Sequence, residues 1–153
     1  MKLSTKGRYA LTALVDVALE SRAGPVSLSA VAERQGISVT YLEQLFMKMR
    51  RAGIVRSIRG PSGGYELEKS ADAIRVSDVL EAVDESINAT EKGAGASGAS
   101  TGSKAQSLSN RVWQSLSANV YVFLHQIRLS DIIDNQIVAC PAVPELFEIE
   151  DET

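Results

Sequence analysis

Apolar residues in the N-terminal third of the chain recur at the three- and four-residue spacing of amphipathic helices. Ser4 is suited to cap a first helix, which is expected to end near Ser21 because a Gly-Pro pair follows shortly afterwards. A second, shorter helix is predicted over residues 27–36 and a third over residues 38–53. The inward side of the third helix is predicted to carry apolar residues at i, i+3, i+4 and i+7, namely Leu42, Leu45, Phe46 and Met49.

After the third helix the hydrophobic period changes to two. Residues 54–59 are rich in β-branched side chains and predict a strand, residues 60–64 predict a turn, and residues 65–67 predict the return strand. Residues 74–76 are compatible with a third short strand. Ser77 is then expected to cap a fourth helix.

Two helices joined by a short turn and followed by a hairpin are typical of a winged helix-turn-helix domain, which we assign to residues 1–90. Residues 91–110 are mostly small or polar and are expected to form a flexible loop. Residues 111–135 predict a helical dimerisation region, and residues 136–153 a loose acidic tail. The predicted fold is therefore mainly α, with a small β-hairpin wing and a long C-terminal dimerisation helix.

One side of the C-terminal helix carries apolar residues at a spacing close to a heptad repeat: Trp113, Leu116, Val120, Phe123 and Ile127. We interpret this row as a dimer seam rather than as a cofactor pocket. The single histidine, His125, falls off the seam on the side of Tyr121 and Arg128. That placement favours a surface or inter-helix position over a metal-binding role.

Charge is distributed unevenly along the chain, whose net charge is −3. Residues 1–90 hold twelve basic and eleven acidic residues, whereas residues 91–153 hold four basic and eight acidic ones. Residues 44–64, which span the third helix and the hairpin, contain five Lys or Arg residues and no acid. Because local charge sets the field that a phosphate backbone experiences, the acidic balance of the whole chain does not exclude nucleic acid as a partner.

The third helix is the predicted reading helix, since its first turns expose side chains that can contact base edges: Val39, Thr40, Tyr41, Glu43 and Gln44. Gln44 can pair with adenine through two hydrogen bonds. Glu43 can only accept, so it favours the amino group of cytosine and is repelled by nearby phosphates. Glu43 is therefore a candidate specificity filter. The alternative is that Glu43 only pairs with a neighbour such as Arg50 or Lys48.

The hairpin turn places Arg59 beside residues with little side-chain bulk, namely Gly60, Pro61 and Ser62. Such a tip fits a narrow minor groove, which attracts arginine through its negative potential. Phosphate contacts are expected from Lys2, Lys6, Arg8, Arg50, Arg51 and Arg56. The remaining candidate DNA-binding residues are Ser4, Tyr9, Ser38 and Lys48.

Other function classes are less well supported by the sequence. No apolar run reaches the ~18 residues of a membrane helix, residues 1–9 lack the apolar core of a signal peptide, and a cytoplasmic location is expected. With one histidine and one cysteine, no nucleophile–base arrangement of an enzyme is visible. A winged-helix module that binds proteins instead of duplex DNA is the alternative.

Several blocks of the sequence resemble the Rrf2 family of bacterial regulators, and within it the regulators of iron–sulfur cluster genes. They are residues 1–10, 35–38, 41–45, 76–85 and the run Arg59-Gly60-Pro61-Ser62-Gly63-Gly64-Tyr65. The likeness is dense over residues 1–90 and looser over residues 111–135. It implies a homodimer with crossing long helices and a palindromic operator near genes for iron–sulfur assembly or iron homeostasis. It also implies base contacts by Thr40, Glu43 and Gln44, with Arg59 and Pro61 in the minor groove.

The chain departs from this family at the cofactor. The resemblance implies a [2Fe–2S] cluster held by three cysteines and one histidine. The first cysteine position aligns with Lys92 and the histidine position with Asn110, and Ala99 and Ala105 lie near the other two cysteine positions. None of these side chains supplies the thiolate that such clusters need. We therefore expect a form without a cluster. Engineered Cys→Ala changes and natural loss both explain the alanines, and Lys92 and Asn110 favour natural loss.

Cys140 is the only cysteine and stands in the predicted tail. It is either a small buried apolar residue, as lone cysteines commonly are, or a metal or redox site. A redox- or metabolite-responsive regulator without a cluster is thus an alternative to a cluster-bearing one.

Overall fold

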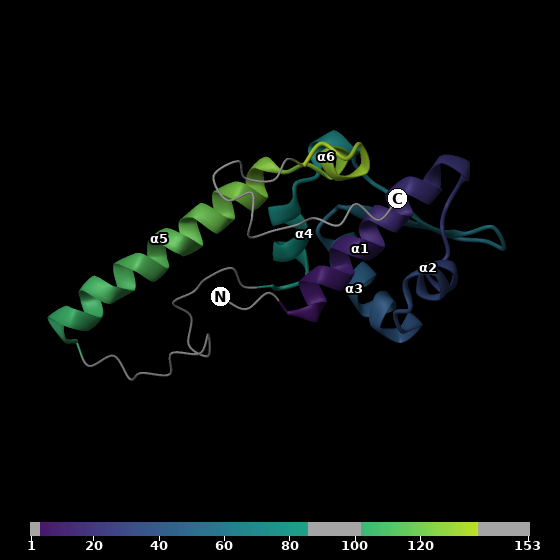
Figure 1. Cartoon of the computed structure of the whole chain (residues 1–153). Coiled ribbons are helices and arrows are strands. Elements are labelled where there is room, and N and C mark those ends of the chain that lie inside the picture. The colour runs from purple at the N-terminus through teal and green to yellow at the C-terminus, as the bar shows by residue number, and fades with distance from the viewer. Residues whose placement is uncertain (1–3, 86–101, 138–153) are drawn as a thin grey trace.

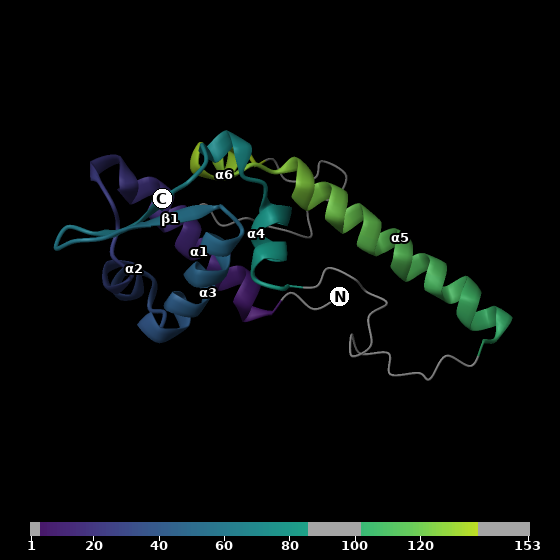
Figure 2. The ribbon, with the colours of Figure 1, turned by 180° about the vertical axis from the view of Figure 1, so that it is seen from behind.

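Six α-helices and one antiparallel hairpin make up the part of the chain that the computed structural model describes, residues 4–85 and 102–137. In both views, α5 extends to one side of the body formed by α1 to α4 and the hairpin extends to the other (Figures 1 and 2). The elements are α1 (Thr5–Glu20), η1 (Ser21–Ala23), α2 (Leu28–Gln35), α3 (Val39–Arg51), β1 (Val55–Ile58), β2 (Gly64–Leu67), η2 (Ala71–Ala73), α4 (Val76–Ala82), α5 (Lys104–Gln126) and α6 (Leu129–Ile133). This order confirms the predicted winged helix-turn-helix with a long C-terminal helix.

Serine side chains cap the first three α-helices and so fix where they begin. The hydroxyl of Ser4 accepts from the Lys6 amide at the start of α1. Ser27 and Ser38 do the same at the starts of α2 and α3. The α2 helix ends at Gly36, whose φ of 64° is the left-handed conformation that glycine adopts without strain. The predicted boundaries of these helices are confirmed.

The long helix α5 begins seven residues before the predicted start at residue 111. Ser103 caps it by accepting from the Gln106 amide, and the following Ala and Gln residues have good helix propensity. The prediction of a loop through residue 110 is therefore wrong over residues 104–110, because the small and polar residues there are compatible with a helix as well as with a loop. Residues 91–101 of that predicted loop lie outside the described residues, as does the predicted tail from residue 138.

The core lies between α1, α3, α4 and the base of the hairpin. The predicted inward side of α3 is confirmed, because Leu42, Leu45, Phe46 and Met49 are all buried. The ring of Phe46 meets that of Tyr65 edge to face at 5.0 Å between centroids, which joins α3 to β2. Leu129, at the start of α6, is also fully buried in this core although it follows α5 in the sequence.

The hairpin is held against the segment before α2. Its register pairs Val55 with Leu67 and Ile58 with Gly64. The backbone of Val26 exchanges two hydrogen bonds with Tyr65, at 2.8 and 2.9 Å. A Cβ atom on Gly64 would lie 2.3 Å from the carbonyl oxygen of Val26, so this close approach requires glycine.

Residues 74–76 do not add a strand to the hairpin. Arg75 instead forms an isolated bridge with Arg128, in which the Val76 amide donates to Ile127 and the Leu129 amide donates to Ile74. The short extended stretch after η2 thus pairs with the chain leaving α5. These two hydrogen bonds join the end of the long helix to the body formed by α1 to α4.

Ser77 is not an N-cap, contrary to the prediction. Arg75 occupies the cap position of α4, and the carboxylate of Asp78 accepts from the Arg75 amide at 3.0 Å. Ser77 is buried within the first turn of α4, two residues after Arg75, with its hydroxyl 3.0 Å from Nδ1 of His125. His125 also stacks on Tyr121, with 5.6 Å between ring centroids, so it lies between helices as expected.

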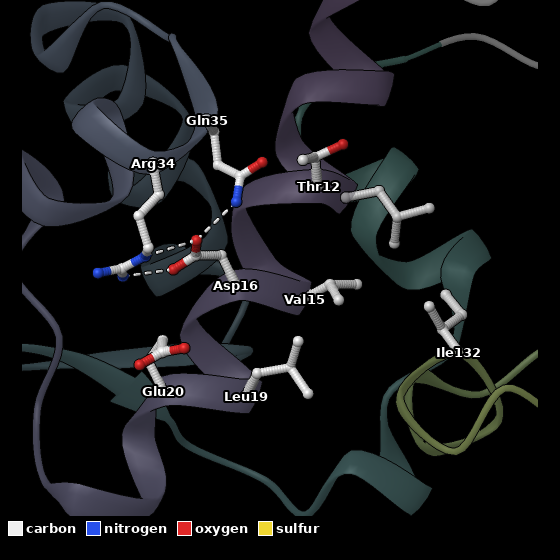
Figure 3. A pocket seen from close by; sticks show the side chains of 9 residues that line it. Thr12, Val15, Asp16, Leu19, Glu20, Arg34, Gln35 and Ile132 are labelled. Atoms are coloured by element: carbon white, nitrogen blue, oxygen red, sulfur yellow. Dashed lines mark hydrogen bonds and ion pairs between the residues drawn. The ribbon is translucent and has the colours of Figure 1, made fainter. Parts of the chain in front are cut away.

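A buried carboxylate fixes α2 against α1. Asp16 of α1 accepts from Nε and Nη2 of Arg34 at 3.0 and 2.6 Å and from the amide of Gln35 at 2.7 Å (Figure 3). These groups form the polar side of a cavity of about 460 Å³, whose apolar side includes Val15 and Ile132. Because Asp16 is almost wholly buried, its charge depends on these three hydrogen bonds.

We expect Asp16→Asn to cost ~1–3 kcal/mol of stability at neutral pH, since buried charge-assisted hydrogen bonds are lost. The hydrogen bonds from Arg34 lower the pKa of Asp16, although burial opposes them. A lowered pKa gives stability that is present above the carboxyl's unfolded pKa and is lost as the pH falls through the folded one. The free energy of unfolding, measured with urea from neutral to acid pH, should therefore depend less on pH in Asp16→Asn than in the unaltered protein. The exposed Asp72→Asn should retain the slope of the unaltered protein, and equal slopes in all three would contradict this assignment.

Candidate nucleic-acid interface

The outward side of α3 presents the predicted reading residues together. Thr40, Glu43 and Gln44 are exposed on one side of the helix, opposite the buried apolar residues. Val39 is exposed at its N-terminus, and Tyr41 is half-buried. Sequence reasoning missed Met47, which lies seven residues after Thr40 on the same side and is 43% exposed. The i+7 spacing from Thr40 was the available signal.

The α1 helix supplies one flank of this reading side. The ring of Tyr9 meets that of Tyr41 edge to face at 5.9 Å between centroids. Arg8 is exposed beside it, while Ser4 is engaged as the cap of α1. Lys2 lies outside the described residues. The structure thus brings together α1 and α3 residues that are more than thirty positions apart in the sequence.

Glu43 makes no salt bridge within the described residues, and its suggested partners are engaged elsewhere. Nζ of Lys48 lies 2.7 Å from Oδ2 of Asp84. Nη1 of Arg50 donates to the hydroxyl of Ser57 at 3.4 Å. The geometry does not support the alternative in which Glu43 only pairs with a neighbour. Its carboxylate is exposed and available to a ligand.

The predicted phosphate-binding cations differ in how they are engaged. Nε of Arg56 donates to Glu66 on the paired strand at 2.6 Å, and Nζ of Lys6 donates to the carbonyl oxygen of Asp84 at 2.9 Å. Arg51 and Arg59 are exposed and form no salt bridge among the residues described. Arg8 is likewise exposed and forms no salt bridge among the described residues, so Arg8, Arg51 and Arg59 are the cations most available to a polyanion.

The tip of the hairpin is narrow and exposed. Arg59, Gly60, Pro61 and Ser62 are all exposed, and a hydrogen bond from the Gly63 amide to the Gly60 carbonyl at 2.9 Å closes the turn. Gly60 has a φ of 119°, which disfavours other residues. The tip therefore presents the Arg59 side chain with little bulk around it, as the sequence predicts.

Two acidic residues after α4 bind the N-terminal turn of α1, and sequence reasoning missed both. The Glu85 carboxylate accepts from the Ser4 hydroxyl at 2.5 Å, the Gly7 amide at 2.8 Å and the Ser4 amide at 3.3 Å. Burial raises the pKa of Glu85, but these hydrogen bonds outweigh it and leave the pKa below its ordinary value. Asp84 precedes it with a φ of 57° and binds Lys6 and Lys48.

The described positions of the implied cluster do not fit a [2Fe–2S] group. Ala105 and Asn110 lie on α5, where a methyl group cannot ligate iron and a carboxamide is no thiolate. The whole chain has one cysteine, so it cannot supply three thiolates. Within residues 4–85 and 102–137, no three His, Cys, Asp or Glu side chains gather as a metal site would require. Lys92, Ala99 and Cys140 lie outside those ranges.

The predicted seam lies on α5, a helix in which no residue is fully buried. Trp113, Leu116 and Phe123 are exposed, Phe123 by 55%, and Val120 is half-buried. Ile127 is half-buried too, but it follows the last turn of α5 as its C-cap. Sequence reasoning missed further exposed apolar residues on this helix, namely Leu108, Val112 and Val122.

None of the helices within the described residues combines the length and the apolar character needed to span a bilayer.

The chain has the architecture of a winged helix-turn-helix protein. Two helices form the helix-turn-helix, and a hairpin wing lies beside the second of them.

Comparison with known proteins identifies the family. The Rrf2 family model, described as an iron-dependent transcriptional regulator, matches residues 3–135. A protein of Cereibacter sphaeroides named HTH-type transcriptional regulator IscR is 62% identical over 154 residues, covering 99% of both chains. The chain belongs to the Rrf2 family of transcriptional regulators. The predictions of a DNA-binding regulator and of a non-enzymatic protein are thereby confirmed.

Solved structures agree with this assignment. The structure of CymR, the global cysteine regulator of B. subtilis, has a TM-score of 0.73 and 33% identity and covers 88% of this chain and 98% of its own. The structure of T. potens IscR has a TM-score of 0.70 and 34% identity and covers 94% and 96%. The winged-helix fold predicted from the sequence is thus that of solved Rrf2-type regulators.

We expect Arg59→Ala to weaken operator binding by ~1–3 kcal/mol, the range for one specific contact. The reason is the exposed arginine on a tip with little other side-chain bulk. Gel-shift titration would measure the loss, with Lys69→Ala as a control that removes one exposed cation beyond the hairpin. Equal effects of the two substitutions would remove Arg59 from the proposed site.

Proposed function

We propose that this protein is a homodimeric, sequence-specific regulator that binds a palindromic operator and controls genes of iron–sulfur assembly or iron homeostasis. The observation that carries the proposal is the arrangement of α3 beside the hairpin. The polar residues of α3 are exposed, and so is Arg59 at the hairpin tip, which forms no salt bridge among the described residues. The relatives that share this fold are named transcriptional regulators. As a regulator of bacterial genes it would act in the cytoplasm.

Each part of the candidate interface has a distinct role in the proposal. Thr40, Glu43 and Gln44 would contact base edges in the major groove, where donor and acceptor patterns distinguish all base pairs. Arg59 would enter the minor groove beside Pro61. Phosphates would be held by cations that carry no sequence information, of which Arg8 and Arg51 are exposed and lack a salt bridge among the described residues.

A second copy of the chain is the proposed occupant of the apolar side of α5. None of the 23 residues of α5 is buried within the described part of the chain, so packing against that part contributes little to the stability of this helix. Pairing two such helices would bury Trp113, Leu116 and Phe123 and would place two reading helices on successive major grooves, ~34 Å apart. That spacing requires a two-fold symmetric operator.

The signal that this regulator senses is proposed to differ from that of a regulator whose [2Fe–2S] cluster is held by three cysteines. The single cysteine and the residues at the described ligand positions favour a redox- or metabolite-responsive regulator without the usual cluster. An absorption spectrum and iron analysis after anaerobic purification from the native host test this directly. Stoichiometric iron with visible charge-transfer bands would refute it.

Glu43→Ala should relax operator specificity more than it lowers affinity. Without a cytosine amino group the Glu43 carboxylate would be desolvated and unpaired, so Glu43 penalises operators that lack that cytosine. The substitution removes both the contact and the penalty. Binding should be measured on a panel of operators with single base changes, where the poorer sites are expected to gain. A uniform loss across the panel with unchanged base preferences would contradict the filter role.

Leu116→Asp should convert the dimer to a monomer, because Leu116 lies near the centre of the apolar side and a buried pair of carboxylates would repel. Sedimentation at micromolar concentration would show the change, and operator affinity should fall with it. Gln114→Glu, which adds one charge to the opposite side of α5, should stay dimeric. A monomeric unaltered protein that still binds its operator specifically would disprove the dimer model.

A further inference from the structure

The turn after α4 places a carboxylate against the flank of the reading helix. Oδ2 of Asp84 lies 2.7 Å from Nζ of Lys48, and the Asp84 carbonyl oxygen accepts from Nζ of Lys6 at 2.9 Å. Lys6 is among the cations expected to contact DNA phosphates, and Lys48 is among the other candidate DNA-binding residues. The hydrogen bond from Lys48 holds the pKa of the Asp84 carboxyl below its ordinary value, so this carboxylate stays ionised at neutral pH.

Lys48 stands at the border between the core and the reading side of α3. It follows Gln44 by one helical turn and Tyr41 by two, so it shares their flank of the helix. Its side chain is 37% exposed and that of Asp84 is 74% exposed. The pair is therefore open to solvent and lies within reach of a polyanion that approaches this flank.

The backbone holds Asp84 in place independently of Lys48. Asp84 has a φ of 57°, a conformation that Asp and Asn tolerate better than most residues. The next residue, Glu85, accepts three hydrogen bonds from Ser4 and Gly7 at the start of α1. Asp84 is thus fixed beside Lys48 by its neighbour, whereas an exposed ion pair of this kind contributes little to stability.

We propose that Asp84 is an internal competitor of the DNA backbone: it occupies Lys48 as a phosphate would and lowers the affinity of the protein for every duplex sequence. This inference rests on the proposed DNA-binding role of α3. A lysine that stays paired with a carboxylate does not neutralise a DNA phosphate, so no condensed counterion leaves the DNA at that position. Because this sequence-independent attraction is reduced, Glu43, Gln44 and Arg59 contribute a larger share of the free energy of DNA binding.

The test compares Asp84→Asn with Asp72→Asn, an exposed acid on η2 for which no hydrogen bond or ion pair is described. Both changes remove one negative charge, and asparagine tolerates the backbone of residue 84. Dissociation constants are measured over a range of salt concentrations for an operator and for a scrambled duplex. Asp84→Asn should bind both duplexes about two- to five-fold more tightly than Asp72→Asn, the range set by freeing one exposed ion pair.

The salt dependence of binding and a second substitution test whether Asp84→Asn acts by freeing Lys48 to contact a DNA phosphate. One added phosphate contact steepens the slope of log K against log salt by ~0.9. When Lys48→Gln is also present, Asp84→Asn should no longer bind DNA more tightly than Asp72→Asn. When Lys6→Gln is present instead, the difference in affinity should remain, because Lys6 is bound by the backbone carbonyl of Asp84 and not by its carboxylate. The thermal unfolding midpoint of Asp84→Asn should equal that of Asp72→Asn.

Three results would overturn the inference: equal affinities of the two Asn variants, an advantage that persists without Lys48, or weaker binding together with a lowered unfolding midpoint. The last result would assign Asp84 a structural role instead. If the unaltered protein shows no salt-dependent binding to any duplex, the proposed function fails, and the inference fails with it. Normal binding by the unaltered protein with any of the three results overturns the inference alone.

Discussion

The packing of the apolar side of α3 into the core is the constraint on which the rest of the structure depends. Leu42, Phe46 and Met49 are fully buried, so the helix cannot rotate about its axis without exposing them. Thr40, Glu43 and Gln44 therefore face outward as a consequence of core packing. Phe46 contacts Tyr65 and so positions the hairpin by the same packing. The interface has the rigidity of the core beneath it.

The helix expected to join two copies is connected to this body differently. Its own side chains are unburied, and it meets the DNA-binding half through the backbone pair at Arg75 and Arg128 and the contact between Ser77 and His125. In the proposed dimer, a change in the angle between the two α5 helices would act on α4 through these contacts. From α4, the turn at Asp84 and Glu85 leads directly to α1 and to Lys48.

Local features of the sequence predicted most of the fold, because they depend on neighbours along the chain. Serine caps, the spacing of Leu42 to Met49 and the small residues of the hairpin tip each carry a local physical signal. The contacts of Asp84 and Glu85 were missed because their partners lie 36 to 81 positions away, where periodicity carries no information. The bridge between Arg75 and Arg128 was not predicted for the same reason. The start of α5 was placed late because its first turn resembles a linker in composition.

Leu129 carries a consequence for how the chain folds. It lies beyond the long helix yet is fully buried in the core of the DNA-binding half, and its amide completes the pairing with Ile74. The boundary of the independent folding unit therefore does not coincide with the end of α4. A truncation that kept only the winged helix would leave a cavity where Leu129 belongs, at a cost of ~2–5 kcal/mol. The long helix separates α6 from α4 in the chain, but Leu129 at the start of α6 packs in the same core as the helices of the DNA-binding half.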